Sequence, residues 1–123
     1  NPGPQDWLQI GSVALKYIKD HYVKDADPTD TKVSPLFEPD LLGVPPAYVL
    51  TCGLDPLRDE GKRYAENLKA AGTDVVQLYE KTMPHGFLNF AKAFPRANTV
   101  PIEAAEFVRA QFPCLPQVKK GRP

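Results

Sequence analysis

Residue types that carry much of protein chemistry are scarce in this sequence of 123 residues. It contains two cysteines, two histidines and only two serines, Ser12 and Ser34. Cys52 and Cys114 are too few for a disulfide scaffold and lie in no CxxC or other metal-ligand spacing. We therefore interpret both as reduced thiols, which are typical of a cytoplasmic protein.

Long apolar runs and an excess of one charge are also absent. A membrane-spanning helix needs about 18 consecutive apolar residues, and no stretch of the chain approaches that length, so we expect a soluble protein. The chain carries 15 basic and 15 acidic side chains, and its formal net charge is zero. This balance provides no extended positive field for phosphates, which argues against nucleic acid or an anionic membrane as the main partner.

A strand, a helix and a second strand follow one another in the middle of the chain. Residues 47–53 are apolar and β-branched without alternation, which predicts a strand buried on both faces. In residues 56–71 apolar side chains recur every three or four positions, and Gly72 then offers a left-handed stop, which predicts a helix. Residues 75–80 predict a second strand near the sheet edge. This order predicts a βαβ unit with two parallel strands.

The remaining segments predict helices and loops. Residues 12–23 have the spacing of a helix with one apolar stripe, and residues 24–46 form a proline-rich loop that we expect to pack down on other parts of the chain. Residues 82–87 lack periodicity and predict a loop, and residues 88–94 a short helical turn. The last helix is predicted to begin at a Thr99 cap and to end before Pro113.

Two polar residues follow the two predicted strands. Asp55 comes just after the first strand, and His85 follows the second between Pro84 and Gly86. Catalytic groups collect at the carboxyl ends of the strands in open α/β sheets. An alternative stays open for each residue. Asp55 is well placed to cap the following helix, and a lone histidine is often a surface or packing residue.

As a pair, these residues favour catalysis. An acid after one strand and a histidine after the next is the order that α/β-hydrolases use for the last two members of a Ser-Asp-His triad. In such a triad the histidine takes the serine proton and returns it to the leaving group, and the carboxylate fixes the tautomer. Neither His21 nor His85 has a second His or Cys at ligand spacing, so we expect no metal and no cofactor.

The residues around this pair resemble the C-terminal part of the hormone-sensitive-lipase-like esterases, the α/β-hydrolase fold-3 group of serine carboxylesterases and lipases. The motifs are LLGVPPA, GLDPLRDEG and HGF, and the match covers roughly residues 34–90. The resemblance implies an α/β fold in which Asp55 is the triad acid and His85 the triad base. It gives no catalytic role to Asp59 or Glu60, and we interpret Arg58 as the partner of a neighbouring carboxylate.

The chain also departs from this family. It contains no Gly-x-Ser-x-Gly elbow and no His-Gly-Gly-Gly oxyanion loop, and neither serine is a credible nucleophile. We therefore expect the chain to be the C-terminal portion of a larger esterase whose N-terminal strands lie elsewhere, and the start at Asn1 agrees with this. The expected parts are a cap-proximal helix and proline-rich loop in residues 1–46, the C-terminal βαβα part in residues 47–113, and a tail in residues 114–123.

The resemblance implies that the intact protein hydrolyses carboxylic esters. The expected partners are a small ester substrate, the missing N-terminal part of the same protein, and a second copy that pairs through the last strand, Val75 to Glu80. Two alternatives remain open. One is a noncatalytic fragment or split half that needs a partner chain, and the other is a thioesterase or peptidase of the same fold.

Overall fold

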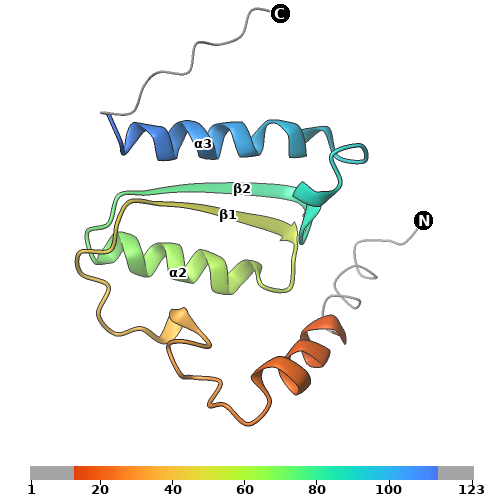
Figure 1. The fold of residues 1–123 in the computed structure, drawn as a ribbon, viewed down its shortest axis with the longest axis vertical. Helices are drawn as coiled ribbons and strands as arrows, with labels where there is room; N and C mark the ends of the chain where they lie inside the picture. Colours follow the sequence, from red (N-terminus) through yellow and green to blue (C-terminus); the bar gives the residue numbers. More distant parts are fainter. Residues whose placement is uncertain (1–12, 114–123) are drawn as a thin grey trace, which may run out of the picture. The chain divides into compact units, whose positions relative to one another are not determined.

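The structure, a computed structural model, describes residues 13–113 of the chain (Figure 1). The chain forms two compact units, residues 1–87 and residues 88–123. Within the described range no helix is long and apolar enough to cross a membrane. Ser12, Cys114 and the expected tail lie outside the described residues.

The first unit is built on two parallel strands joined by a helix. β1 (Ala47–Leu54) pairs with β2 (Val75–Pro84), and Ala47 lies opposite Val75. The connection is α2 (Arg58–Ala70), which runs along one face of the strand pair (Figure 1). The predicted parallel strands and the helix between them are therefore confirmed.

Burial along β1 increases toward its carboxyl end. Thr51, Cys52 and Gly53 are buried, whereas the other residues of the strand are half-buried. Neighbouring residues of a strand point to opposite faces, so both faces are covered at this end. The predicted two-sided burial thus holds only where β1 approaches Asp55.

The end of α2 agrees with the prediction, and its start does not. Gly72 adopts a φ of +87°, and its N–H donates to the carbonyl of Lys69 at 3.0 Å. The N–H of Thr73 donates to the carbonyl of Leu68, also at 3.0 Å, which completes a Schellman stop. The helix begins at Arg58, two residues later than predicted, because Pro56 lies in a turn that the Asp55 side chain closes.

β2 is longer than predicted and contains an irregularity. Cys52 lies opposite Glu80, and the next aligned pair is Leu54 and Pro84. One residue of β1 therefore faces three of β2, residues 81–83, which we call the β2 bulge. The sequence predicted a loop here because a bulge interrupts the alternation by which strands are recognised.

The N-terminal part of the first unit is helical, as predicted, over its described residues. Residues 13–18 are α-helical and continue as the π-helical turn η1 (Lys19–Val23). Its predicted apolar stripe, which includes Tyr17 and Ile18, is exposed: these two side chains are 64% and 50% accessible. The proline-rich loop contains the 3-10 turn η2 (Pro35–Phe37). The expected packing of its apolar residues is seen at the buried Leu41 and not at Phe37 and Leu42, which are exposed.

The described residues of the second unit, 88–113, include the helix α3 (Val100–Ala110) and a polar network at its start. A 3-10 turn, η3 (Phe87–Asn89), spans the junction of the units, and η4 (Pro95–Asn98) precedes α3. The helical turn predicted around residues 88–94 is present as η3 and a following turn, in which the N–H groups of Ala93 and Phe94 both donate to the carbonyl of Phe90 at 2.9 Å.

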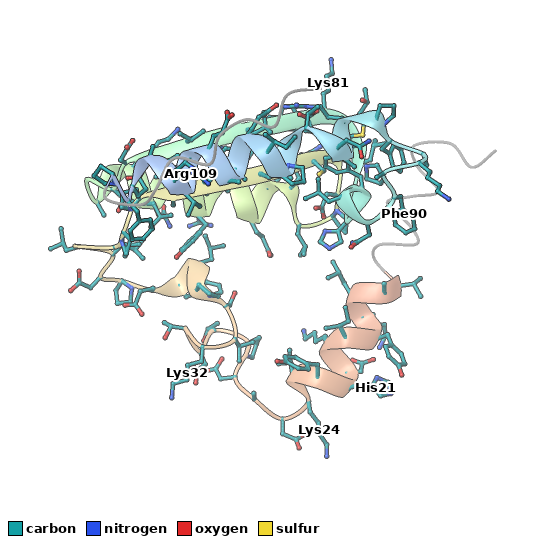
Figure 2. The ribbon with its side chains drawn as sticks, turned by 45° about the horizontal axis from the view of Figure 1, so that its top comes forward. His21, Lys24, Lys32, Lys81, Phe90 and Arg109 are labelled. Carbon is teal, nitrogen blue, oxygen red and sulfur yellow. The ribbon has the colours of Figure 1, made fainter. Side chains whose placement is uncertain are left out.

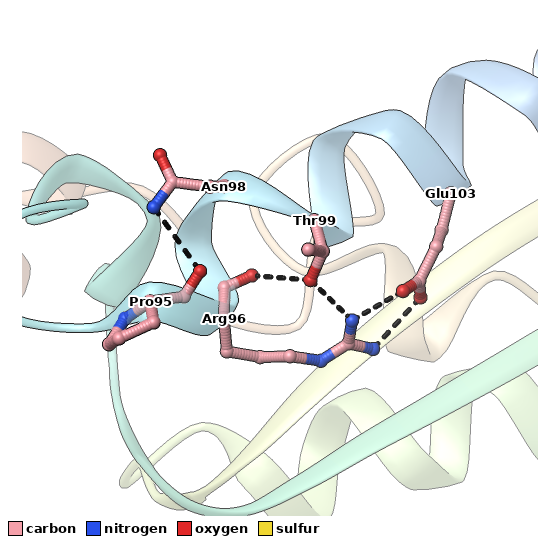
Figure 3. A network of polar contacts seen from close by, with 5 residues as sticks. All are labelled: Pro95, Arg96, Asn98, Thr99 and Glu103. Atoms are coloured by element: carbon pink, nitrogen blue, oxygen red, sulfur yellow. Dashed lines mark hydrogen bonds and ion pairs between the residues drawn. The ribbon is translucent and has the colours of Figure 1, made fainter.

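Thr99 precedes α3 but makes no side-chain capping bond. Its hydroxyl accepts from Nη1 of Arg96 at 2.6 Å and donates to the carbonyl of Arg96 at 3.2 Å (Figure 3). Nη1 and Nη2 of Arg96 also donate hydrogen bonds to the two carboxylate oxygens of Glu103.

Candidate active site

The two predicted site residues meet at the carboxyl ends of the strands. Asp55 follows β1 directly, and His85 follows β2 directly. Oδ2 of Asp55 lies 2.8 Å from Nδ1 of His85, within hydrogen-bond distance. The fold therefore brings together an acid and a histidine that are 30 residues apart in the sequence.

The β2 bulge is what brings these residues level. With an unbroken register, Met83 would lie opposite Asp55, and His85 would extend beyond it. The bulge advances β2 by two residues, so that Pro84 pairs with Leu54. Asp55 and His85 are then the next residues on their respective strands. A bulge that aims a side chain at a site is a recurrent feature of strands near active sites.

Asp55 uses both of its carboxylate oxygens. Oδ1 accepts the backbone N–H of Leu57 at 2.8 Å, which closes an Asx turn before α2, and Oδ2 faces His85. Asp55 is thus not the N-cap of α2, which is Leu57 without a side-chain cap bond; it closes the turn before the helix and contacts His85 with the same carboxylate. The carboxylate is 11% exposed, whereas the imidazole is 66% exposed. With Nδ1–H donated to Asp55, Nε2 is the nitrogen left to accept a proton.

The bulge depends on a close approach of two backbone segments. A Cβ atom added to Gly53 would lie 1.7 Å from the carbonyl oxygen of Lys81, far inside van der Waals contact. The Lys81 side chain points away from the ribbon (Figure 2), so its backbone alone occupies the space beside Gly53. Glycine is therefore required at this position, and the sequence interpretation missed its role.

Gly53→Ala is expected to lower the free energy of unfolding by about 3 kcal/mol, the upper end of overpacking costs, because backbone cannot move aside as a flexible side chain can. Gly43→Ala is the matched control. Gly43 has a φ of +73° but nothing within 4 Å of its added Cβ, so we expect a loss of about 1 kcal/mol there. Urea denaturation followed by circular dichroism measures both, and equal losses would contradict the close-approach argument.

The residues after His85 hold the imidazole in place. Gly86 has a φ of +71°, a conformation that favours glycine. Phe87 is 1% exposed and is among the largest fully buried side chains of the described residues. The predicted loop is therefore a short turn, anchored by β2 on one side and by a buried ring on the other.

Other candidate groups are occupied or unreactive. The ring of His21 stacks on the ring of Tyr17 with 4.0 Å between centroids, and Nδ1 of His21 lies 2.8 Å from the backbone carbonyl of Tyr17, one helical turn earlier. Burial, with added repulsion from the charges of Asp55 and Glu80, raises the pKa of Cys52 to about 11. This thiol is therefore protonated at neutral pH and a poor nucleophile. Residues 13–113 contain no cluster of three or more His, Cys, Asp or Glu placed to hold a metal.

Arg58 and Asp59 form an ion pair, as expected of Arg58. Nε of Arg58 donates to Oδ1 of Asp59 at 2.7 Å. This hydrogen bond is the main cause that holds the pKa of Asp59 below its usual value. Ser34 lies in the proline-rich loop just before η2 and not on a strand-to-helix turn, so it has no resemblance to a nucleophile elbow.

Parallel strands that carry an acid and a histidine at their carboxyl ends define the class of α/β hydrolases. This chain belongs to the alpha/beta hydrolase fold family, whose pattern matches residues 4–89. The resemblance to its hormone-sensitive-lipase-like members, and the α/β-hydrolase fold predicted from it, are confirmed by the relatives that follow.

The chain is 47% identical over 84 residues to the carboxylic ester hydrolase LipN of Mycobacterium tuberculosis, a match that covers 68% of this chain and 20% of LipN. It is 39% identical over 61 residues to hormone-sensitive lipase of Ictidomys tridecemlineatus, covering 48% of this chain and 8% of that protein. A thermophilic and thermostable carboxylesterase cloned from a metagenomic library superposes with a TM-score of 0.74 at 36% identity, covering 80% of this chain and 33% of that one. The chain thus spans a fifth or less of the length of these two curated relatives.

Proposed function

We propose that this chain supplies the acid and the base of a Ser-Asp-His triad in a carboxylic ester hydrolase. The observation that carries the proposal is the 2.8 Å contact between Asp55 and His85 at the carboxyl ends of two parallel strands. The names of the relatives, a carboxylic ester hydrolase and a hormone-sensitive lipase, support an ester as the substrate.

In this proposal the imidazole of His85 accepts and delivers one proton in each half of the reaction. Nε2 takes the proton of the serine hydroxyl as that oxygen attacks the ester carbonyl, and then delivers it to the leaving alcohol. A water molecule next gives a proton to Nε2 while it attacks the acyl carbonyl, and Nε2 then returns this proton to the serine oxygen as the acyl–oxygen bond breaks, which releases the acid and restores the serine. Asp55 accepts Nδ1–H throughout, which keeps Nε2 unprotonated at the start and stabilises the imidazolium that forms.

The nucleophile is proposed to lie outside these 123 residues, because the sequence contains no Gly-x-Ser-x-Gly elbow. Among the described residues β1 pairs only with β2, so each strand has an edge available for pairing. We assign the edge of β1 to the strands that carry the serine and the oxyanion donors. We assign the edge of β2, at Val75 to Glu80, to a second copy of the protein. The reduced state expected of the buried Cys52 fits a cytoplasmic enzyme.

A fluorophosphonate probe, which labels activated serines, tests this proposal. We expect the 123-residue chain alone to remain unlabelled, and the intact protein that carries it to be labelled at a serine beyond these residues. The intact protein should also hydrolyse p-nitrophenyl esters faster than matched thioester or peptide substrates. Labelling of Ser12 or Ser34 in the chain alone would contradict the assignment of the nucleophile. A preference for thioester or peptide would point to the other hydrolases of this fold.

A further inference from the structure

One side chain joins the two ends of the turn that carries Asp55. Arg58 is the first residue of α2, and its Nη1 donates to the carbonyl oxygen of Gly53 at 3.2 Å. The same guanidinium donates from Nε and Nη2 to the two carboxylate oxygens of Asp59, at 2.7 and 3.1 Å. Residues 54–57 form the turn. Arg58 therefore links Gly53, the residue before this turn, to α2, the helix that follows it.

The contact with Gly53 lies where the strand register breaks. Gly53 is the single β1 residue that faces the β2 bulge. The hydrogen bonds to Asp59, together with its charge, are the main causes that raise the pKa of the Arg58 guanidinium. A planar guanidinium with several N–H groups in use holds one geometry more rigidly than a single ammonium would.

The positive charge of Arg58 is paired with Asp59 and not with Asp55, the carboxylate that faces His85. Both oxygens of Asp59 bind the guanidinium, whereas the oxygens of Asp55 accept from Leu57 and face His85. Arg58 thus holds the turn in place without drawing the Asp55 carboxylate toward itself. Its contribution to the site is geometric.

We infer that Arg58 is a positioning residue for Asp55, which it holds at the distance and angle that His85 requires. The inference rests on the proposed function, in which Asp55 is the triad acid. Loss of the Arg58 side-chain contacts leaves the turn held by two bonds of its own, from the N–H of Leu57 to Oδ1 of Asp55 and from the N–H of Arg58 to the carbonyl of Asp55, and the carboxylate then occupies a wider range of positions. A misplacement of about 1 Å in a catalytic group can cost about 10²-fold in rate, so we expect kcat to fall by about 10- to 100-fold with KM unchanged.

The test compares three variants of the intact protein. Arg58→Met removes the side-chain hydrogen bonds to Gly53 and Asp59 and keeps a long side chain. Arg58→Lys keeps the charge but cannot reach Gly53 and both Asp59 oxygens together. Arg63→Met is the matched control, since Arg63 is an exposed arginine of the same helix. We expect kcat to follow the order Arg63→Met, then Arg58→Lys, then Arg58→Met, with KM within about twofold throughout, as for an interaction made mainly in the transition state.

A second readout separates this inference from the proposed function. The Nδ1 proton of His85, observed by NMR in the unsubstituted protein, should broaden or shift upfield in Arg58→Met and not in Arg63→Met. If Arg58→Met lowers only the melting temperature and leaves kcat and the Nδ1 proton unchanged, Arg58 is merely structural and the inference is overturned. If the unsubstituted protein hydrolyses no ester, the proposed function fails, and the NMR comparison still decides whether Arg58 positions the carboxylate.

Discussion

Replacement of His85 by alanine is expected to abolish the acyl-enzyme burst with a chromogenic ester in the intact protein. The imidazole is the only proposed carrier of the serine proton, and its Nε2 is directed away from Asp55 by the Nδ1 contact. Without it the hydroxyl attacks as a neutral alcohol and the leaving group departs without a proton. In other serine hydrolases, loss of the triad histidine lowers kcat by about 10⁶-fold, and we expect a loss of that order.

His21→Ala is the matched control for this substitution. His21 is also exposed, but its ring stacks on Tyr17 and its Nδ1 is bound within the same helix. Stopped-flow measurement of the burst and steady-state turnover should therefore give wild-type values for this variant. A burst that persists in His85→Ala, with the fold intact by circular dichroism, would remove His85 from the mechanism.

The part of the fold that could be predicted from the sequence is the part set by local patterns. The apolar run of residues 47–53 and the three- and four-residue spacing in residues 56–71 report burial and helical period directly, and both elements are present in the structure. Gly72 likewise marks the helix end through its own backbone conformation. Each of these signals is contained within a few neighbouring residues.

The alignment of the site could not be predicted in the same way. It depends on which residues of β1 and β2 lie opposite each other, and that pairing joins segments far apart in the sequence. The β2 bulge occupies residues that read as a loop, because Lys81 and Thr82 are both exposed and break the alternation. A signal was present in Gly53, since a glycine at the end of a buried strand often marks a bulge or a close backbone approach.

The start of α2 illustrates a different limit. The sequence left two roles open for Asp55, one at the start of the helix and one in catalysis, yet a carboxylate has two oxygens and can serve both.

The amphipathic stripes show a third limit, since periodicity predicts which residues share a face of a helix and not what covers that face. Ile18, from the stripe predicted in residues 12–23, and Ile102, from the apolar stripe predicted for the last helix, are both exposed.

Asp55→Asn is the substitution that best separates the two roles of this residue. Asparagine keeps a carbonyl oxygen for the N–H of Leu57 and starts helices as well as aspartate does. We therefore expect the melting temperature to change little. Turnover, in contrast, should fall by about 10⁴-fold, as it does when the triad acid of a serine protease is replaced by its amide.

The expected loss follows from the direction of one hydrogen bond. With its oxygen held by Leu57, the asparagine presents an NH₂ group to Nδ1 of His85, and this nitrogen must then accept. The proton of the neutral imidazole moves to Nε2, which can no longer take the serine proton. Glu60→Gln, which removes an exposed acid from the first turn of α2, should leave kcat unchanged. If Asp55→Asn keeps its turnover, Asp55 is not the triad acid. Its role would then be to close the Asx turn through the N–H of Leu57, which is the contact that the amide preserves.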